Sequence, residues 1–347
     1  MNDRLLSTGT SLSTAQIDRA CGVLLGAACG DALGAGYEFG AAPLPPAGEA
    51  PTMIGGGLGG FAPGEWTDDT AQTHAVAGVA ATGADLREER SLDAVAQRFA
   101  DWYADGPPDV GIQTRQVLVD AGRHPTAAHM AGVARTVHEH TGRSAGNGSL
   151  MRTAPVALAH LDAPVATVHA AMAVSSLTHF DPRGGEACAL WCLFIRHAVL
   201  LGTLDGARDA LCHLPESSRD YWAERLDEAE SRDPSSFSPN GWVVAALQAA
   251  WSAISHTPIS GGPEDQQGSD HLQRALETAI RLGDDTDTVA AIAGALLGAR
   301  WGRSAVPSSW CQAVHGWPGA RAEDLVELAL RIVGVSRDAD GATTGKV

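Results

Sequence analysis

The chain has 347 residues, a formal net charge of −17 at pH 7, 44% hydrophobic residues and 19% charged residues. This composition is typical of a soluble globular protein and excludes a largely disordered chain. The length suits one large domain or two ordinary ones. Because the average field is negative and no basic block occurs, we expect no nucleic-acid partner. A small anionic ligand is still compatible with this charge, because backbone N–H groups and a metal act locally.

The apolar segments of the sequence are short. The longest, residues 289–299, contains two glycines and cannot span a bilayer. The first twenty residues lack the basic region and the continuous apolar core of a signal peptide. We therefore expect a cytoplasmic protein with no membrane partner.

The six cysteines form no CxxC pair. The two closest, Cys188 and Cys192, lie one helical turn apart, with His197 following. A zinc site at this pair is the less common outcome for such a spacing, and thiols buried among apolar neighbours are the commoner one. We expect all six to be reduced and structural.

Helical patterns dominate the sequence. Alanine and leucine recur at three- and four-residue spacing and predict helices over residues 15–34, 92–104, 164–179, 184–202, 240–255 and 287–302. Aromatic residues are only 5% and β-branched runs are scarce, so no strand series is predicted. Glycine and alanine at intervals of about one turn let helices approach closely. The predicted fold is all-α, a compact single-domain orthogonal helical bundle.

Three segments have irregular composition. Residues 40–64 form a Pro/Gly-rich loop, residues 258–270 are expected to be a mobile surface connection, and the end of the chain is expected to be a disordered tail. A long glycine-rich loop in a compact domain is unusual unless it serves a site. No fixed-period repeat occurs. We expect an N-terminal tail over residues 1–17, one catalytic domain over 18–335 and a C-terminal tail over 336–347.

Two acidic turns, far apart in the sequence, each stand at the start of a predicted helix. The first comprises Thr67, Asp68 and Asp69, and the second comprises Asp284, Asp285, Asp287 and Thr288. Helix capping explains either turn alone, because Asp and Thr accept from free N–H groups and complement the helix dipole. Together, oxygen-only ligands match a hard cation such as Mg²⁺ or Mn²⁺, and two such turns can hold two metals roughly 3.5–4 Å apart. The residues alone leave both interpretations open.

Other polar residues have weaker signals. Asp31 and Glu38 lie at the end of a glycine-spaced helix, and for Asp31 a structural role is favoured over direct catalysis. The segment 145–158 is a glycine-rich turn entering a helix, which can present N–H groups to an anion or can be an ordinary turn. His179 stands at a helix-to-loop transition, where a lone histidine is more often structural.

Seven segments in chain order resemble the ADP-ribosylglycohydrolase family. They are residues 22–39, 64–73, 105–114, 146–158, 175–187, 238–253 and 282–298. The specific motifs are W-T-D-D-T, a distant D-x-D-T and G-N-G-x-x-M-R, and the resemblance extends from about residue 20 to residue 302. It implies an all-helical fold and Mg²⁺-dependent hydrolysis of the bond between ADP-ribose and a protein side chain. The partner would be an ADP-ribosylated protein, and ADP-ribose would be the product.

On this resemblance, every metal-ligand position of the family is filled by a competent residue, and other functional residues have counterparts here. Two Mg²⁺ ions, with Mn²⁺ as the alternative, would be bound by Thr67, Asp68, Asp69, Asp285, Asp287 and Thr288. Glu38 would close the cleft near the metals, and Asp109 would be a catalytic base or a charge-stabilising carboxylate. Gly111 would approach the phosphates through its N–H group. The ADP-ribose contacts would come from Gly146, Asn147, Gly148, Ser149, Met151, His179 and Trp242.

The resemblance also bears on the linkage that is cleaved. The transition state has oxocarbenium character, and a carboxylate such as Asp109 or Glu38 can take a proton or stabilise the charge. A carboxylate suits a guanidinium leaving group, so we expect ADP-ribosylarginine. The alternatives are a serine, nucleobase or ester linkage, and a catalytically silent member that binds ADP-ribose. One departure from the family is Asp284, where a second glycine usually precedes D-x-D-T. Its added carboxylate would alter metal affinity or point to solvent.

Overall fold

α-Helices provide nearly all regular structure in the residues that the computed structural model describes, which are 11–337 and 343–345. The α-helices are α1 (Thr14–Gly34), α2 (Asp68–Ala80), α3 (Glu89–Ala104), α4 (Ile112–Ala121), α5 (Ala127–Thr141), α6 (Ala154–Ala159), α7 (Pro164–Ser176), α8 (Pro182–Leu201), α9 (Ala207–Ala210), α10 (Glu216–Ser231), α11 (Val243–Ser255), α12 (Glu264–Arg281), α13 (Thr286–Trp301), α14 (Ser308–Ala313) and α15 (Ala322–Ile332). The 3₁₀ turns are η1 (Ala35–Gly40), η2 (Asn147–Ser149), η3 (Leu211–His213), η4 (Pro234–Phe237) and η5 (Arg303–Ala305).

Two small antiparallel ribbons complete the described structure. β1 (His315–Gly316) pairs with β2 (Ala320–Arg321), and β3 (Val335–Arg337) pairs with β4 (Thr343–Gly345). The predicted all-α class is confirmed, and each helix predicted from the alanine–leucine pattern is present within a few residues of its expected bounds. The prediction of a loop over residues 258–270 is wrong in its second half, because α12 begins at Glu264, directly after Pro263 at its N-cap.

The ends of the chain differ in part from the expected tails. α1 begins at Thr14, inside the segment expected as an N-terminal tail, because Ser13 and Gln16 form a reciprocal capping box. Residues 1–10 lie outside the described part of the chain. Of the expected C-terminal tail, residues 338–342 and 346–347 also lie outside it, whereas residues 336–337 and 343–345 belong to the β3–β4 ribbon.

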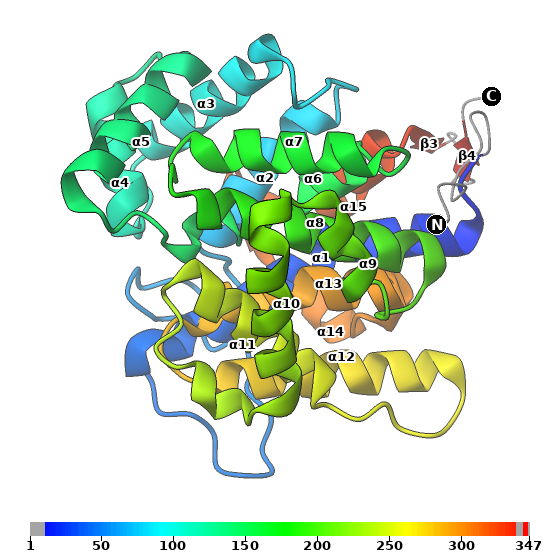
Figure 1. Ribbon diagram of the computed structural model, residues 1–347. Helices are drawn as coiled ribbons and strands as arrows, with labels where there is room; N and C mark the ends of the chain where they lie inside the picture. Colours follow the sequence, from blue (N-terminus) through cyan, green and yellow to red (C-terminus); the bar gives the residue numbers. More distant parts are fainter. Residues whose placement is uncertain (1–10, 338–342, 346–347) are drawn as a thin grey trace.

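The centre of the fold is the antiparallel pair α1 and α13, drawn in blue and orange in Figure 1. A Cβ atom on Gly26 would lie 2.3 Å from the carbonyl oxygen of Gly294, and one on Gly22 would lie 2.3 Å from that of Gly298. The two backbones therefore touch, which only glycine permits at this distance. Because the helices are antiparallel, the C-terminal end of α1 meets the N-terminal end of α13, and the second acidic turn starts there.

Other helices cover this pair on all sides. α3, α4 and α5 form one end of the molecule, and α11 and α12 pack together on the opposite side (Figure 1). Two helical segments, Thr14–Gly40 and Pro182–Leu201, are long and apolar enough to cross a membrane, but their apolar windows are 100% and 89% buried inside the fold. Such burial is what core helices of a globular domain show.

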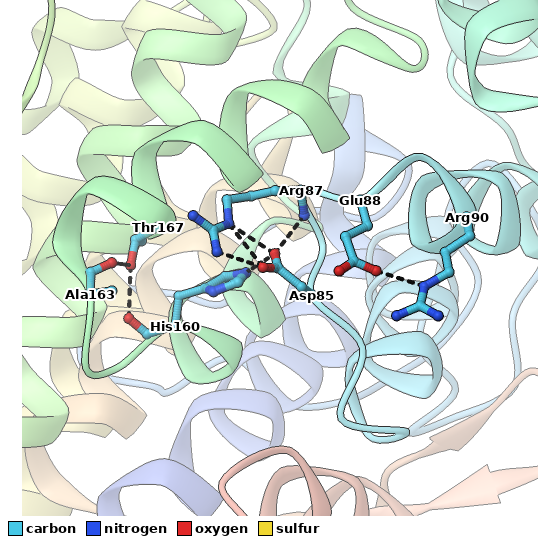
Figure 2. Close-up of polar contacts among 7 residues, drawn as sticks. All are labelled: Asp85, Arg87, Glu88, Arg90, His160, Ala163 and Thr167. Carbon is cyan, nitrogen blue, oxygen red and sulfur yellow. Dashed lines mark hydrogen bonds and ion pairs between the residues drawn. The ribbon is translucent and has the colours of Figure 1, made fainter. Parts of the chain in front are cut away.

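The connection between α2 and α3 is tied to the turn between α6 and α7. Figure 2 shows Asp85, whose carboxylate accepts two hydrogen bonds from Arg87 Nε at 2.9 and 3.1 Å and lies 3.7 Å from His160 Nε2. The hydrogen bonds from Arg87 lower the pKa of Asp85 to about 2. On the same turn, the Thr167 hydroxyl donates to the carbonyl oxygens of His160 and Ala163, each at 3.1 Å. The approach of Asp85 to His160 places the connection that follows α2 next to the turn before α7.

The six cysteines are free. Cys188 and Cys192 are buried on α8 and contact Ser149 and Thr153, as expected for structural thiols. His197 points elsewhere, because its Nε2 lies 2.9 Å from both Thr203 and Asp205. Cys212 is exposed and Cys311 is half-buried.

Candidate functional site

The first acidic turn is fastened to α1 by Asp31, which is completely buried. Its Oδ1 accepts from the Thr67 N–H at 2.9 Å, and its Oδ2 accepts from the N–H and the hydroxyl of Thr70 at 3.0 and 2.6 Å. Burial raises the pKa of Asp31 to about 6, although these hydrogen bonds oppose the rise. Both oxygens hold the first turn of α2, which is the structural role expected for Asp31.

In the first acidic turn, helix capping uses Thr67, and the carboxylates of Asp68 and Asp69 make other contacts. Thr67 is the N-cap of α2, and its Oγ1 accepts from the Asp69 N–H at 3.4 Å. The same hydroxyl donates to Asp69 Oδ2 at 3.0 Å. Asp68 faces the loop before α4, since its Oδ2 accepts from Gln72 Nε2 at 3.1 Å and from the Gly111 N–H at 3.5 Å. Capping therefore uses one hydroxyl, and neither Asp carboxylate is needed for it.

The second acidic turn is placed against the first by α13. Asp285 occupies the N-cap position, and its N–H donates to Asn240 Oδ1 at 3.0 Å. Thr288 reaches across to the first turn, and its hydroxyl donates to Asp69 Oδ2 at 3.4 Å. Asp287 is 3% exposed, one residue before it. The two turns, more than two hundred residues apart in the sequence, are thus in direct contact.

Carboxylate oxygens from both turns converge with those of Asp31 and Glu38. Oxygens of Asp31, Asp69 and Asp287 lie within 4.8 Å of one another, and so do oxygens of Glu38, Asp285 and Asp287. Three of the buried oxygens have no hydrogen-bond partner: Glu38 Oε2, Asp69 Oδ1 and Asp287 Oδ1. An orphaned buried carboxylate oxygen is costly unless a cation or a donor is present. The cluster therefore has the unsatisfied acceptors that a metal site requires.

The raised pKa values of the clustered carboxyl groups also indicate a site that a cation would stabilise. Burial, followed by the charges of Asp285 and Asp109, raises the pKa of Glu38 to about 8. Burial, followed by Asp109 and Asp31, raises the pKa of Asp68 to about 8. Burial and neighbouring carboxylates also hold the pKa values of Asp69 and Asp287 well above the usual range.

Among the described residues these carboxylates have no direct cationic partner, although the buried guanidinium of Arg152 lies near enough to Asp68 for the two charges to interact. Within residues 11–337 and 343–345, the carboxylates of Asp31, Glu38 and the two acidic turns form no ion pair with Arg, Lys or His. A cation bound among them would neutralise their repulsion. The donors are carboxylates and hydroxyls, which suit a hard divalent cation such as Mg²⁺ or Mn²⁺ better than a soft one. The residues therefore fit a metal centre.

Asp284, the departure from the family pattern, does not join the cluster. It has a left-handed backbone, with φ 56°, and follows Gly283 at φ 77°. Its carboxylate accepts a short hydrogen bond from the Ser238 hydroxyl, and its carbonyl oxygen accepts from the Phe39 N–H at 2.7 Å. The added carboxylate is thus held by the loop before α11, and the backbone of the same residue fixes the position of η1.

The glycine-rich turn before α6 lies against the second acidic turn. Asn147 donates from Nδ2 to Asp285 Oδ2 at 2.7 Å. Gly148 packs against His179, since a Cβ atom there would lie 3.2 Å from His179 Cε1. Ser149 differs from its neighbours, because its buried hydroxyl accepts from Ser175 at 2.9 Å and faces the core. Met151 is buried below the turn, with its sulfur 4.0 Å from the Thr288 hydroxyl.

His179 is held by two residues that sequence reasoning did not select. Arg152 Nη2 donates to Thr178 Oγ1 at 2.7 Å, and Thr178 Oγ1 lies 2.7 Å from His179 Nδ1. Burial, with a smaller contribution from Arg152, lowers the pKa of His179 to about 3. The hydrogen bond with Thr178 occupies Nδ1, so Nε2 is the ring nitrogen that faces the glycine-rich turn, 3.4 Å from a Cβ atom placed on Gly146.

Two further residues position the site without having been predicted. Asn240 accepts from the Asp285 N–H and donates to the Gly283 carbonyl oxygen at 3.1 Å. Gln113 donates to the carbonyl oxygens of Ser144 and Thr178, at 3.0 and 2.9 Å. Asn240 and Arg152 both lie inside segments that carried the family resemblance, so the signal was present. Their roles depend on partners far away in the sequence.

The remaining predicted residues lie around the cluster. Asp109 is half-buried in the loop between α3 and α4, and its Oδ1 accepts from the Val110 N–H at 2.8 Å. Gly111 begins α4, with its N–H directed at Asp68. Trp242 is 48% exposed and forms an isolated β-bridge with Gly146. A cavity of about 450 Å³ opens next to Asp68 and Asp109.

The chain matches the ADP-ribosylglycohydrolase family model over residues 12–341. It is 29% identical to the ADP-ribosyl-[dinitrogen reductase] glycohydrolase of Rhodospirillum rubrum, over 84% of this chain and 89% of that protein. It is 30% identical to an ADP-ribosylarginine hydrolase of Pseudomonas putida, over 86% of this chain and 74% of that protein.

A human protein and a solved structure are also similar. The chain is 30% identical to the human ADP-ribosylhydrolase ARH3, over 73% of this chain and 75% of that protein. Among solved structures, it is similar to a chain of an ADP-ribosylglycohydrolase-related protein complex, with a TM-score of 0.64 and 28% sequence identity. That similarity covers 92% of this chain and 99% of the other.

Proposed function

Because the chain belongs to the ADP-ribosylglycohydrolase family and is a hydrolase of ADP-ribosyl linkages, we propose that it removes ADP-ribose from modified arginine side chains of proteins. The observation that carries the proposal is the placement of Asp109 beside a buried, oxygen-only carboxylate cluster. The reaction would release ADP-ribose and restore an unmodified arginine.

The proposed cofactor is a pair of Mg²⁺ ions held between the two acidic turns. Their ligands would be Thr67, Asp68, Asp69, Asp285, Asp287 and Thr288, with Glu38 closing the cleft. The two overlapping carboxylate groups, which share Asp287, support two positions rather than one. When bound, the ions would supply Lewis-acid chemistry at the anomeric end of the substrate.

Residues of the protein would provide proton transfer, charge stabilisation and the contacts that bind ADP-ribose. The Asp109 carboxylate can accept the proton of the attacking water or stabilise positive charge that develops on the ribose ring. In the tautomer with its proton on Nε2, the neutral His179 would donate to a ribose or phosphate oxygen from beside the glycine-rich turn. Backbone N–H groups of Gly146, Gly148 and Ser149 would bind the diphosphate. The N–H of Asn147 donates to the Gly241 carbonyl oxygen at 3.1 Å, and that of Gly111 is directed at Asp68. Met151 would support the turn from below, and the half-exposed Trp242 would stack on the adenine.

Arginine is favoured over serine by the chemistry of the leaving group. A guanidinium is planar and cationic, and it pairs well with carboxylates such as Asp109. The similarity to an ADP-ribosylarginine hydrolase, at 30% identity over 86% of this chain, supports this choice, and the similarity to ARH3 has the same identity over 73% of it. The position of the Asp109 carboxylate beside the cluster is the argument that comes from this chain's own residues.

A side-by-side assay tests the linkage. Purified protein with Mg²⁺ would be incubated with arginine-linked and serine-linked ADP-ribosyl peptides, and the released ADP-ribose would be quantified. We expect faster release from arginine and a loss of about a hundredfold or more in Asp109→Asn. Faster release from serine, or full arginine activity in Asp109→Asn, would reverse the assignment.

The net charge and the burial of the two long apolar helices bear on where the protein acts and on its partners. A charge of −17 disfavours nucleic acid as a partner, and the two long apolar helices are buried in the fold rather than offered to a membrane. We propose that the protein acts in the cytoplasm on ADP-ribosylated proteins. Fractionation of cells followed by immunoblotting would test the location, and recovery of the protein in the membrane fraction would contradict it.

A further inference from the structure

A cavity on the α2 side of the carboxylate cluster has no role in the proposal above. Its volume is about 450 Å³, and it lies between the loop that joins α3 to α4 and the β1–β2 hairpin. Its apolar lining includes the rings of Trp66, Trp102 and Trp317. Asp68 and Asp109 line it as well, so it opens directly onto the cluster.

The polar lining of this cavity is mainly acidic. Four carboxylates line it: Glu65, Asp68, Asp105 and Asp109. The basic groups in the lining are Arg321, which is exposed on β2, and His315. A ligand with a positive charge therefore fits this lining better than a phosphate does.

Asp105 and Trp317 form a hydrogen-bonded pair in the lining of the cavity. Asp105 Oδ2 accepts from Trp317 Nε1 at 2.9 Å, which fixes the indole next to the carboxylate. Within the described residues, the Asp105 carboxylate accepts this one hydrogen bond, so its second oxygen is available to a ligand. Glu65 is occupied differently, because its Oε2 accepts from the Ala62 N–H at 2.7 Å. A flat aromatic face beside an available carboxylate is the arrangement that binds a guanidinium group.

The cavity and the glycine-rich turn contact different acidic turns. Asn147 donates to Asp285 in the second acidic turn, whereas Thr67 and Asp68 of the first line the cavity. If ADP-ribose extends over the glycine-rich turn, its anomeric carbon lies over the cluster, and the group bonded to that carbon points to the cavity side. The leaving group then enters a space that is acidic and aromatic.

We infer that this cavity is the subsite for the target's arginine side chain, with Asp105 and Trp317 as its specificity-determining contacts. This inference rests on the proposed function. Hydrolysis breaks the bond between C1″ and the guanidinium nitrogen, adds the hydroxyl of water to C1″ and transfers a proton to the departing nitrogen. The side chain stays in the cavity throughout this exchange, and its charge is matched by the acidic lining.

Two variants test separately the contributions of the Asp105 charge and of the Trp317 ring to substrate binding. Asp105→Asn removes the charge while its amide oxygen can still accept from Trp317, and Trp317→Ala removes the ring. With an ADP-ribosylarginine peptide, we expect KM to rise about tenfold in each, because a charge-assisted contact is lost. Calorimetry should give an unchanged affinity for free ADP-ribose. The matched control is Asp101→Asn, an exposed residue one turn earlier on α3 that does not line the cavity, which should behave as wild type.

A binding experiment distinguishes failure of the subsite from failure of the proposed function. Agmatine, a guanidinium without the peptide, should quench tryptophan fluorescence of the wild type and do so more weakly in Asp105→Asn. Putrescine, an amine of similar length, should quench less than agmatine. If the protein cleaves no ADP-ribosylarginine peptide but binds agmatine, the proposed function fails and the subsite stands. If it cleaves the peptide while KM and agmatine binding are unchanged in both variants, the subsite is wrong.

Discussion

The amide of Asn147 donates to Asp285 Oδ2 at 2.7 Å and thereby joins the glycine-rich turn to the second acidic turn. Asp285 receives no other side-chain hydrogen bond within the described residues, and its N–H is held by Asn240. Asn147 is 8% exposed, so its orientation is fixed by its surroundings. The position of a proposed metal ligand thus depends on a proposed substrate-binding residue.

Replacement of Asn147 by alanine should weaken metal binding and ADP-ribose binding together. Loss of a residue that orients a metal ligand costs about 10- to 100-fold in metal affinity or activity. Titration of activity with Mg²⁺ and calorimetry with ADP-ribose measure the two effects. Unchanged Mg²⁺ dependence in a variant that still folds would show that Asn147 does not position Asp285.

Removal of the metal should abolish activity but leave the fold intact. EDTA should stop turnover, and excess Mg²⁺ should restore it, while the helical circular dichroism stays native. A cation that binds only the folded state stabilises it by about 2.7 kcal/mol at a hundred times Kd, so Mg²⁺ should raise Tm. Full activity in EDTA would exclude the metal mechanism.

The variants Asp69→Asn and Asp287→Asn should separate metal binding from folding. Each replaces a carboxylate that is buried among others and has an orphaned oxygen. Without metal, we expect each variant to melt at or above the wild-type temperature, because repulsion is relieved. With Mg²⁺, the rise in Tm should be lost. Calorimetric scans with and without Mg²⁺ test this, and a retained metal-dependent rise would mean that these residues are not ligands.

The contact between α1 and α13 should tolerate no added methyl group. In Gly26→Ala the new Cβ would lie 2.3 Å from the Gly294 carbonyl oxygen, so the helices must separate. We expect a loss of about 1–3 kcal/mol or more in the free energy of unfolding, as for other overpacked cores. Gly132→Ala on α5 is the matched control, because its Cβ meets nothing within 4 Å, and it should add about 0.5–1 kcal/mol. Urea denaturation measures both, and equal effects would contradict the close packing.

The neutral His179 should make the protein sensitive to acid. Its pKa is lowered to about 3 in the folded state, against an unfolded value of about 6.5. Between these values the unfolded chain binds the proton and the folded chain does not. The stability contributed by the neutral ring is therefore complete above pH 6.5 and falls as the pH decreases towards 3, by about 1.4 kcal/mol per pH unit.

The substitution His179→Gln should reduce that slope, while His140→Gln, an exposed residue on α5, should leave it unchanged. Denaturant unfolding at a series of pH values between 3 and 7 gives the slopes directly. Other buried histidines add to the wild-type slope, since burial also lowers the pKa of His74 to about 4. Identical slopes in wild type and His179→Gln would show that His179 is not held neutral.

Local sequence patterns were sufficient to predict the helices in which apolar residues recur at helical spacing. Residues 15–34 and 287–302 repeat alanine, leucine and glycine at helical spacing, and the structure has α1 and α13 there. α10 and α12 were not predicted, because their sequences are largely polar and only a narrow stripe is buried. In α10 that stripe is Ser218, Trp222, Leu226 and Ala229. Such helices form because they cover a core that other segments create.

The sequence by itself determined the residue types of the site and the order of its acidic turns, because oxygen ligands at a helix start are a local feature. The tertiary structure decided which of them meet. Asp287 lies beside Asp31 and Asp69 because α1 and α13 pack backbone to backbone. The Ser149 hydroxyl turns into the core, and the Trp317–Asp105 pair closes a cavity, through contacts between segments up to 212 residues apart. No local pattern encodes such contacts, since they exist only after the chain has brought distant surfaces together.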